Sequence, residues 1–214
     1  MFQIKEHIAI IRFMEPVTTE SVQILIDKAN LVIDYYFLKH IRLEIDSPGG
    51  EVSALGMFQE YRETLKERGV ILETHALCNV SSAAAIMLSL GDVGHRSAGK
   101  HAKILYHFAR VNGSMQLTAN KSRQLSKDLD ETDQHLIEKL IEHNADAVYQ
   151  QFQHNQCFPK KTISMRSKRF AKSSASEWEK FQKSVKNRYR ALFALDEPMS
   201  AEHAQDFCLI DHIA

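Results

Sequence analysis

Residues 78–107, CNVSSAAAIMLSLGDVGHRSAGKHAKILYH, determine how the fold of this 214-residue chain is organised. They lead from the end of an apolar strand through Ser81 and Ser82 into a helix of small and apolar residues, and they close on a strand that ends in His107. A serine at a strand-to-helix turn lies beside unpaired backbone N–H groups at the positive end of the helix dipole. That environment favours developing negative charge, as a serine nucleophile requires.

Strand and helix patterns alternate before this segment. Apolar, β-branched runs predict strands at 7–13, 41–45 and 70–77, with amphipathic helices between them. The first helix is predicted to begin after an N-cap at Thr18, and the second to end at Gly69. This alternation is typical of βαβ units with right-handed crossovers, so the sequence predicts an α/β fold with a parallel sheet.

Three chemically suggestive points follow predicted strands: the glycine pair of DSPGG (46–50), the serines Ser81 and Ser82, and His107. In parallel sheets, sites form beyond the carboxyl ends of the strands. A glycine pair there lets the backbone approach a ligand with its N–H groups exposed. The residues alone therefore predict a site at this edge of the sheet.

Four separated motifs resemble the proteolytic subunit of the ATP-dependent Clp proteases, which belongs to the crotonase-like superfamily. They are DSPGG after IRLEI, the helix start SSAAAIMLSLG, the strand KILYH and the C-terminal DEPMSAEHAQDFCLID, in the family's order. The resemblance covers about residues 7–150 and 194–214. It implies a crotonase-like fold of repeated ββα and βαβ units, with residues 1–214 forming a single domain.

The resemblance also implies a catalytic site. It places the nucleophile on Ser82, the general base on His107 and the triad acid on Asp196, with the backbone N–H groups of Gly50 and Ala83 as the oxyanion hole. The interval of 25 residues from Ser82 to His107 matches that of the family. Neither a metal nor a cofactor is implied.

Each of these side chains also has a structural interpretation. Ser81 is the favoured N-cap and the second candidate for the nucleophile, which would leave Ser82 as a first-turn residue. His107 is one of eleven histidines and could be a buried structural side chain, and Asp196 could be a turn residue before Pro198. Residue types alone favour these interpretations, whereas the order and spacing of the four motifs favour the site.

Two segments extend beyond the motifs. Helical spacing predicts a long, handle-like helix over 118–155, which projects or packs against another subunit. A basic, helical insertion follows over 157–190: residues 160–190 hold eleven Lys or Arg against two Glu, a net charge of +9. This insertion is either a solvated hairpin or an interaction surface for an acidic partner.

Composition limits the partners and the compartment. Because 27 basic residues balance 27 acidic ones, no general attraction to nucleic acid or to a membrane is expected. The N-terminus lacks a signal-peptide pattern and no apolar run is long enough to span a membrane, so we expect a cytoplasmic location. The three cysteines lack CxxC spacing and predict neither a disulfide framework nor a zinc site.

The predicted function is that of a serine endopeptidase of the Clp type, acting on peptides or unfolded proteins inside a self-compartmentalised homo-oligomeric ring. The chain begins almost at its first strand, so the family's extension toward an ATP-dependent unfoldase is expected to be absent. Phe108 and Ala109 replace the family's Gln-Pro, and only Gly113 remains of its glycine-rich segment. Cys208 stands where the family has glycine, at a helix end that requires a positive φ.

Two other functions are compatible with the sequence. The first is a catalytically degenerate ring subunit or scaffold that recruits a partner through the basic insertion. The second is a crotonase-like enzyme acting on acyl thioesters, in which the same backbone N–H groups would stabilise an enolate.

Overall fold

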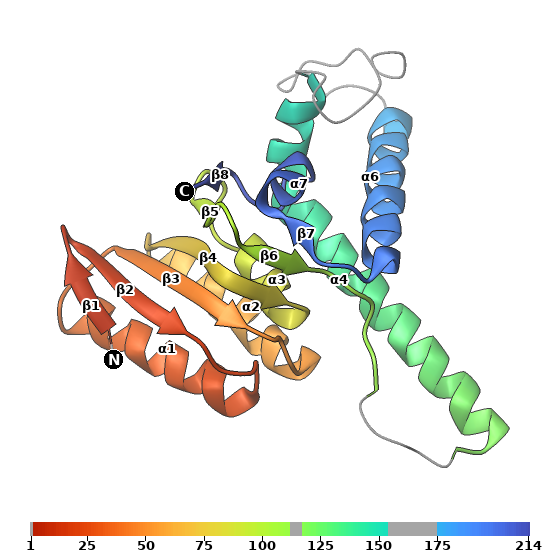
Figure 1. The fold of residues 1–214 in the computed structure, drawn as a ribbon, viewed down its shortest axis with the longest axis horizontal. Helices are drawn as coiled ribbons and strands as arrows, with labels where there is room; N and C mark the ends of the chain where they lie inside the picture. The colour runs from red at the N-terminus through yellow and green to blue at the C-terminus, as the bar shows by residue number, and fades with distance from the viewer. Residues whose placement is uncertain (1, 112–116, 154–174) are drawn as a thin grey trace.

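The computed structural model describes residues 2–111, 117–153 and 175–214. Its strands form one sheet in the order β1-β2-β3-β4-β5-β8, with β6 beside β4 and β7 beside β6 (Figure 1). Strands β2 to β5 are mutually parallel, which confirms the predicted α/β class. The strands are β1 (Phe2–Lys5), β2 (Ile8–Phe13), β3 (His40–Ser47), β4 (Ile71–Ser81), β5 (Arg96–Ala98), β6 (Lys103–Leu105), β7 (Met199–Ser200) and β8 (His212–Ile213).

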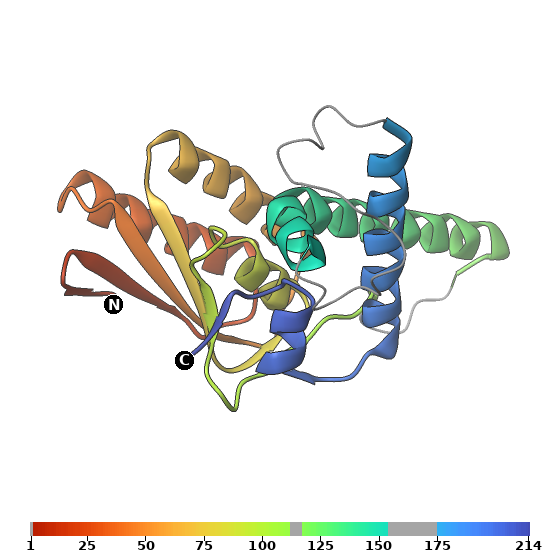
Figure 2. The same ribbon diagram turned by 90° about the horizontal axis from the view of Figure 1, so that it is seen from above.

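The helices of the first half of the chain cover one face of this sheet, while the other face carries no helix at β1–β3 (Figure 2). The helices are α1 (Thr19–Asp34), α2 (Val52–Glu67), α3 (Ala83–Ser89), α4 (Ala119–Gln153), α6 (Ala175–Leu195) and α7 (Ala201–Asp206). The Thr18 side chain accepts a hydrogen bond from the backbone N–H of Ser21, and the Ser21 side chain accepts one from the backbone N–H of Thr18. The predicted N-cap is therefore confirmed, and it forms a capping box. Gly69 ends α2 with φ +63°, also as predicted.

Strand β4 is central, and it is longer than the predicted 70–77. Its first half pairs with β5 through 74–76, and its second half pairs with β6 through 79–81. Val80 is the one apolar residue of 79–81, between the polar Asn79 and Ser81, which is too short a signal to predict the extension. The three-residue β5 and the two-residue β8 were missed as well, because strands this short have too few residues to show a period.

Helices α4 and α6 lie side by side away from the sheet, and the first half of α4 projects beyond the rest of the molecule in both views (Figures 1 and 2). Lys186 of α6 forms a 2.8 Å ion pair with Glu138 of α4. Helix α6 covers the second part of the basic segment, whereas 157–174 and Gly113 lie outside the described residues. None of the helices in the described part of the chain is long and apolar enough to cross a membrane.

Candidate functional site

Ser82 is the residue that joins β4 to α3, and its backbone is strained. Its φ of 56° and ψ of −128° lie in a region that non-glycine residues rarely adopt. Ser82 is itself the N-cap of α3, whereas Ser81 is the last residue of β4, so the prediction that Ser81 caps the helix was wrong. The Ser82 side chain makes no capping hydrogen bond, which leaves the hydroxyl free of a structural role at the helix start.

The DSPGG turn packs directly against this serine. A Cβ atom added at Gly49, whose φ is +88°, would lie 2.5 Å from Ser82 Cβ and 2.4 Å from the carbonyl oxygen of Ser81. Gly50 is equally constrained, because an added Cβ would lie 2.1 Å from the carbonyl oxygen of Val17. Only glycine allows the turn to approach the serine this closely.

Two backbone N–H groups near Ser82 are not used by the neighbouring structure. The bridge between Val17 and Gly50 is made by the N–H groups of Val17 and Glu51, so the Gly50 N–H takes no part in it. Ala83 is the first residue of α3, where an N–H has no partner within the helix. Both are the donors that the sequence predicted for an oxyanion hole.

Substitution of Gly49 by alanine tests the close packing of this turn. We expect Gly49→Ala to lower the free energy of unfolding by about 3 kcal/mol or more, because the new methyl group meets backbone atoms and the φ is unfavourable. Gly94 is the matched control, since its φ of +91° is nearly the same but nothing lies within 4 Å of an added Cβ. Gly94→Ala should cost only about 1–2 kcal/mol. Equal losses in urea titrations of the two variants would contradict the packing argument.

Strand β6, which leads to His107, pairs with the end of β4 that leads to Ser82. Ser81 pairs with Leu105, and the Ser82 N–H donates to the Leu105 carbonyl oxygen at 2.8 Å. The His107 Nδ1 atom lies 2.6 Å from the carbonyl oxygen of Phe108. Since a carbonyl can only accept, this bond selects the tautomer with the proton on Nδ1, and Nε2 keeps the lone pair that a general base needs.

Tyr106 anchors the strand end that carries His107. It is 1% exposed, and its hydroxyl oxygen lies 2.5 Å from the Ser89 hydroxyl and 3.0 Å from the Ala85 carbonyl oxygen, both in α3. Its ring stacks on Phe193 of α6 at 5.6 Å between centroids. The helix that begins at Ser82 and the strand that precedes His107 are therefore held together by a buried tyrosine.

Asp196 reaches the same region through β7. Strands β6 and β7 are antiparallel with Ile104 opposite Met199, and His107 and Asp196 each lie three residues along the chain from this pair, on the same side of it. The Asp196 carboxylate, however, forms an ion pair with Arg110, and both side chains are about half exposed (47% and 53%). Within the described residues, no hydrogen bond joins His107 to Ser82 or to Asp196. The described residues thus contain no hydrogen-bonded triad, although the strands next to the three residues pair with one another.

Three further residues contribute to this region and were not singled out from the sequence: Tyr106, Arg110 and Asp133. Asp133 of α4 is 6% exposed, and its Oδ1 accepts the Ala109 N–H at 2.7 Å. Its neighbours along the helix, from Asp130 to His135, are polar and mostly exposed, so the sequence pattern does not distinguish it from a solvated face. Arg110 was hidden for a different reason, since its pairing with a residue 86 positions away depends on the fold.

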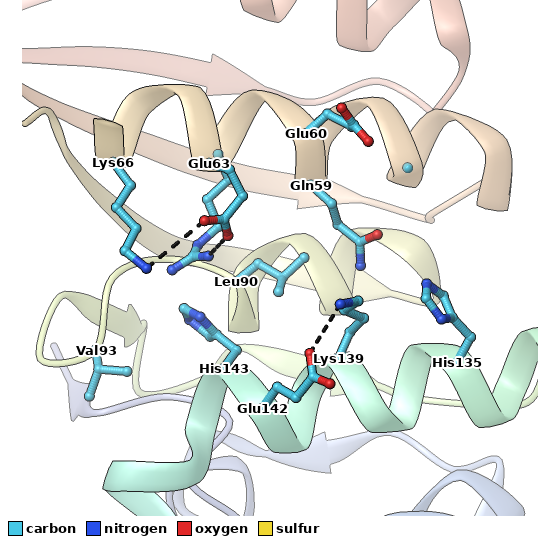
Figure 3. A pocket seen from close by; sticks show the side chains of 12 residues that line it. Gln59, Glu60, Glu63, Lys66, Leu90, Val93, His135, Lys139, Glu142 and His143 are labelled. Carbon is cyan, nitrogen blue, oxygen red and sulfur yellow. Dashed lines mark hydrogen bonds and ion pairs between the residues drawn. The ribbon is translucent and has the colours of Figure 1, made fainter. Parts of the chain in front are cut away.

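A hollow of the structure lies elsewhere. A groove of about 900 Å³ lies between α2 and α4, lined by mixed charges that include Glu63, Lys66, Lys139 and Glu142 (Figure 3). None of the five residues predicted for the site lines it. The described residues also contain no group of three or more histidine, cysteine or acidic side chains that could hold a metal ion.

His143, at one end of this groove, makes stability depend on pH. Burial, with Arg62 adding positive charge, lowers the pKa of His143 to about 4, and its Nε2 lies 2.7 Å from the Gly91 carbonyl oxygen. Below about pH 6.5 His143 is protonated in the unfolded chain, whereas in the folded chain it is protonated only below about pH 4. The free energy of unfolding therefore decreases as the pH is lowered from about 6.5 to about 4. We expect this residue to contribute a loss of about 1–2 kcal/mol between pH 7 and pH 5.

Urea unfolding at the two pH values measures this contribution. In His143→Gln, whose amide can still donate to Gly91, the loss between pH 7 and pH 5 should shrink by that amount. His101→Gln is the control, since His101 is exposed and should leave the difference unchanged. An undiminished loss in His143→Gln would show that other groups cause the acid sensitivity.

The fold defines the class of protein: a mixed α/β domain built on a largely parallel sheet. At the carboxyl edge of this sheet, the turn that contains Ser82 is hydrogen-bonded to the end of β6, the strand that precedes His107. The family follows from the sequence, because residues 4–157 match the family model of Clp protease. The match covers well over half of the chain, which therefore belongs to the Clp protease family. Membership implies the crotonase-like fold and supports a peptidase activity. No curated protein matches the chain.

Proposed function

We propose that the chain is a serine endopeptidase in which Ser82, His107 and Asp196 form the catalytic triad. The observation that carries the proposal is the strained Ser82, which occupies a strand-to-helix turn against Gly49 in a member of the Clp protease family. Strain at a single polar residue is costly, about 1–3 kcal/mol, and it is concentrated at functional sites. An ordinary N-cap would need no such conformation.

The chemistry follows from the atoms near Ser82. The Ser82 hydroxyl attacks a peptide carbonyl and its proton moves to His107 Nε2, which later donates it to the leaving amine. The Gly50 and Ala83 N–H groups would stabilise the oxyanion, each worth about 3 kcal/mol of barrier lowering. For Asp196 to stabilise the imidazolium, it must leave Arg110 and turn to His107. Catalytic hydrogen bonds often form only with substrate bound.

Assembly and location complete the proposal. Members of the Clp protease family typically form oligomeric rings, and we propose that this chain forms a homo-oligomer enclosing its sites. The projecting half of α4 supports this, because its side chains at 119–128 are nearly all exposed in the single chain. Peptides or unfolded proteins are the proposed substrates. A cytoplasmic location rests on the sequence patterns alone, and an ATP-dependent unfoldase is a possible but doubtful partner.

The test combines turnover with covalent labelling. Purified protein is incubated with an unfolded protein such as casein, the fragments are identified by mass spectrometry, and a second sample is treated with a fluorophosphonate probe. We expect internal cleavage and a probe adduct on the peptide that contains Ser82. Absence of both in a folded, oligomeric sample would refute the proposal.

One observation favours a second candidate, a non-catalytic ring subunit or scaffold. The Asp196 carboxylate, the proposed triad acid, is paired with Arg110 instead of with His107, as would be expected in a catalytically degenerate site. The same labelling experiment separates the two, since a scaffold has no reason to retain a reactive Ser82. A folded ring without cleavage or labelling would support the scaffold.

A further inference from the structure

Arg110 follows His107 by three residues, and its guanidinium forms an ion pair with the Asp196 carboxylate. The two side chains are 53% and 47% exposed. Ion pairs this exposed are weak, because water competes for both charges. Asp196 can therefore be replaced on Arg110 by another carboxylate at little cost in free energy.

The ion pair is within reach of a peptide bound at Ser82. The Ser82 N–H donates to the Leu105 carbonyl oxygen at 2.8 Å, so Ser82 lies beside the strand that leads to Arg110. At most about 18 Å of extended chain separates Leu105 from Arg110. A bound peptide covers that distance with about five residues, so one of its side chains or its C-terminus can meet the guanidinium.

The proposed base and the proposed acid of the triad have other partners in this arrangement. The His107 Nδ1–H donates to the Phe108 carbonyl oxygen at 2.6 Å, and the Asp196 carboxylate is paired with Arg110. A guanidinium is the side chain best matched to a carboxylate, because its planar set of N–H donors fits the two oxygens. A carboxylate of the substrate is therefore the chemical group suited to replace Asp196.

We propose that Arg110 is a specificity-determining residue that binds a carboxylate of the substrate close to the scissile bond, and that this binding releases Asp196 to His107. The inference rests on the proposed peptidase function, and it names acidic peptides as the substrate class. The carboxylate belongs to an aspartate or glutamate side chain or to the C-terminus of the peptide. Both sources present the same two oxygens to the guanidinium.

The exchange keeps the charge of Arg110 paired and transfers no proton. The substrate carboxylate takes the place of Asp196 on Arg110. Asp196 then accepts the Nδ1–H of His107, which leaves the Phe108 carbonyl oxygen. The triad chemistry follows, in which the Ser82 proton moves to His107 Nε2 and from there to the leaving amine. Without a substrate carboxylate Asp196 stays on Arg110, so neutral peptides are cleaved slowly.

Opposite effects on two kinds of peptide separate this role from a structural one. Removal of the Arg110 side chain frees Asp196 for His107, so neutral peptides are cleaved faster. The same removal takes away the group that binds the substrate carboxylate, so acidic peptides lose their advantage. A purely structural Arg110 would change the cleavage of both peptides in the same direction or of neither.

The experiment measures kcat and KM for two peptides that differ only in glutamate or glutamine beside the bond that is cleaved. With the unaltered protein we expect kcat/KM to be about fivefold higher for the glutamate peptide, as a half-exposed ion pair gives effects of this size. Arg110→Met should abolish this preference and raise kcat for the glutamine peptide about two- to fivefold, with KM unchanged. Arg110→Lys keeps the charge and should retain part of the preference.

Two further measurements use the unaltered protein. A preference for a C-terminal acid over a C-terminal amide would assign the bound carboxylate to the peptide terminus, whereas a preference for glutamate over glutamine assigns it to a side chain. Salt screens exposed charges, so an increase from about 0.05 M to about 0.5 M should reduce the preference for the acidic peptide and speed cleavage of the neutral one. The salt experiment tests the exchange even if Arg110→Met does not fold.

Arg12→Met is the matched control. Arg12 is 57% exposed and forms a 3.0 Å ion pair with Glu44 of β3, so its removal should leave the kinetics of both peptides unchanged. The inference is overturned if the unaltered protein prefers neither carboxylate, or if folded Arg110→Met cleaves both peptides more slowly. A protein that neither cleaves peptides nor labels at Ser82 removes the proposed function itself, whereas cleavage without a preference removes this inference alone.

Discussion

Replacement of Ser82 by alanine is expected to reduce peptide cleavage by on the order of 10⁵-fold and to abolish fluorophosphonate labelling. The substitution removes one hydroxyl oxygen, which is the atom that would form the acyl-enzyme bond. Alanine meets the same backbone strain at φ 56° as serine does, and the Ser82 side chain makes no capping bond, so stability should change by less than about 0.5 kcal/mol. Loss of activity in a variant that is equally stable would then result from the missing hydroxyl group and not from unfolding.

Ser81 provides the matched control for this experiment. It is the neighbouring serine and the second candidate for the nucleophile, but it is the last residue of β4, paired with Leu105. Ser81→Ala should retain labelling and most of the activity. Labelling that persists in Ser82→Ala and disappears in Ser81→Ala would transfer the nucleophile to Ser81, and labelling that persists in both would remove the serine mechanism.

Much of the fold could be predicted because local chemistry fixes it. The Thr18 cap, the Gly69 terminator and the Gly49 turn each depend on a few adjacent residues, and the structure has the expected conformation at each. The positive φ predicted at the helix end occupied by Cys208 is likewise found, at 58°. A cysteine in that conformation is strained, which identifies a position where glycine would stabilise the chain.

For the candidate site, only the arrangement of the backbone could be predicted from the sequence. The four motifs identified the strand ends that meet, and the pairing of Ser81 with Leu105 and of Ile104 with Met199 brings them together. The charge partners were beyond prediction from sequence, because the contacts of Asp196 with Arg110 and of Asp133 with Ala109 join residues from different elements. No periodicity or spacing encodes such contacts.

Arg96 is another residue whose contacts could not be predicted from the sequence. Its charged side chain lies in the core, at a position that an apolar side chain would normally fill. It is fully buried, and its guanidinium makes bonds of 2.9 and 2.6 Å to the two carboxylate oxygens of Asp211. It also donates to the Ser89 carbonyl oxygen and to the side chain of Asn144. One side chain thus connects β5 with α3, α4 and the C-terminal segment.

We expect Arg96→Met to lower the free energy of unfolding by about 3–5 kcal/mol, as removal of one partner of a buried ion pair does. Burial alone would raise the pKa of the Asp211 carboxyl, but its bonds with Arg96 hold that pKa below the ordinary value. Without Arg96 the carboxylate keeps its desolvation cost and loses its counter-charge. Urea unfolding followed by circular dichroism measures the loss.

A surface pair gives the control for this prediction. Arg12 and Glu44 form a 3.0 Å ion pair in which Arg12 is 57% exposed, so Arg12→Met should cost less than about 1 kcal/mol. Because Ser89 lies beside Tyr106, which anchors the strand end before His107, Arg96→Met should also lower peptidase activity at temperatures where the protein is still folded. Similar losses of stability in the two variants would contradict the view that Arg96 stabilises the core beneath the site.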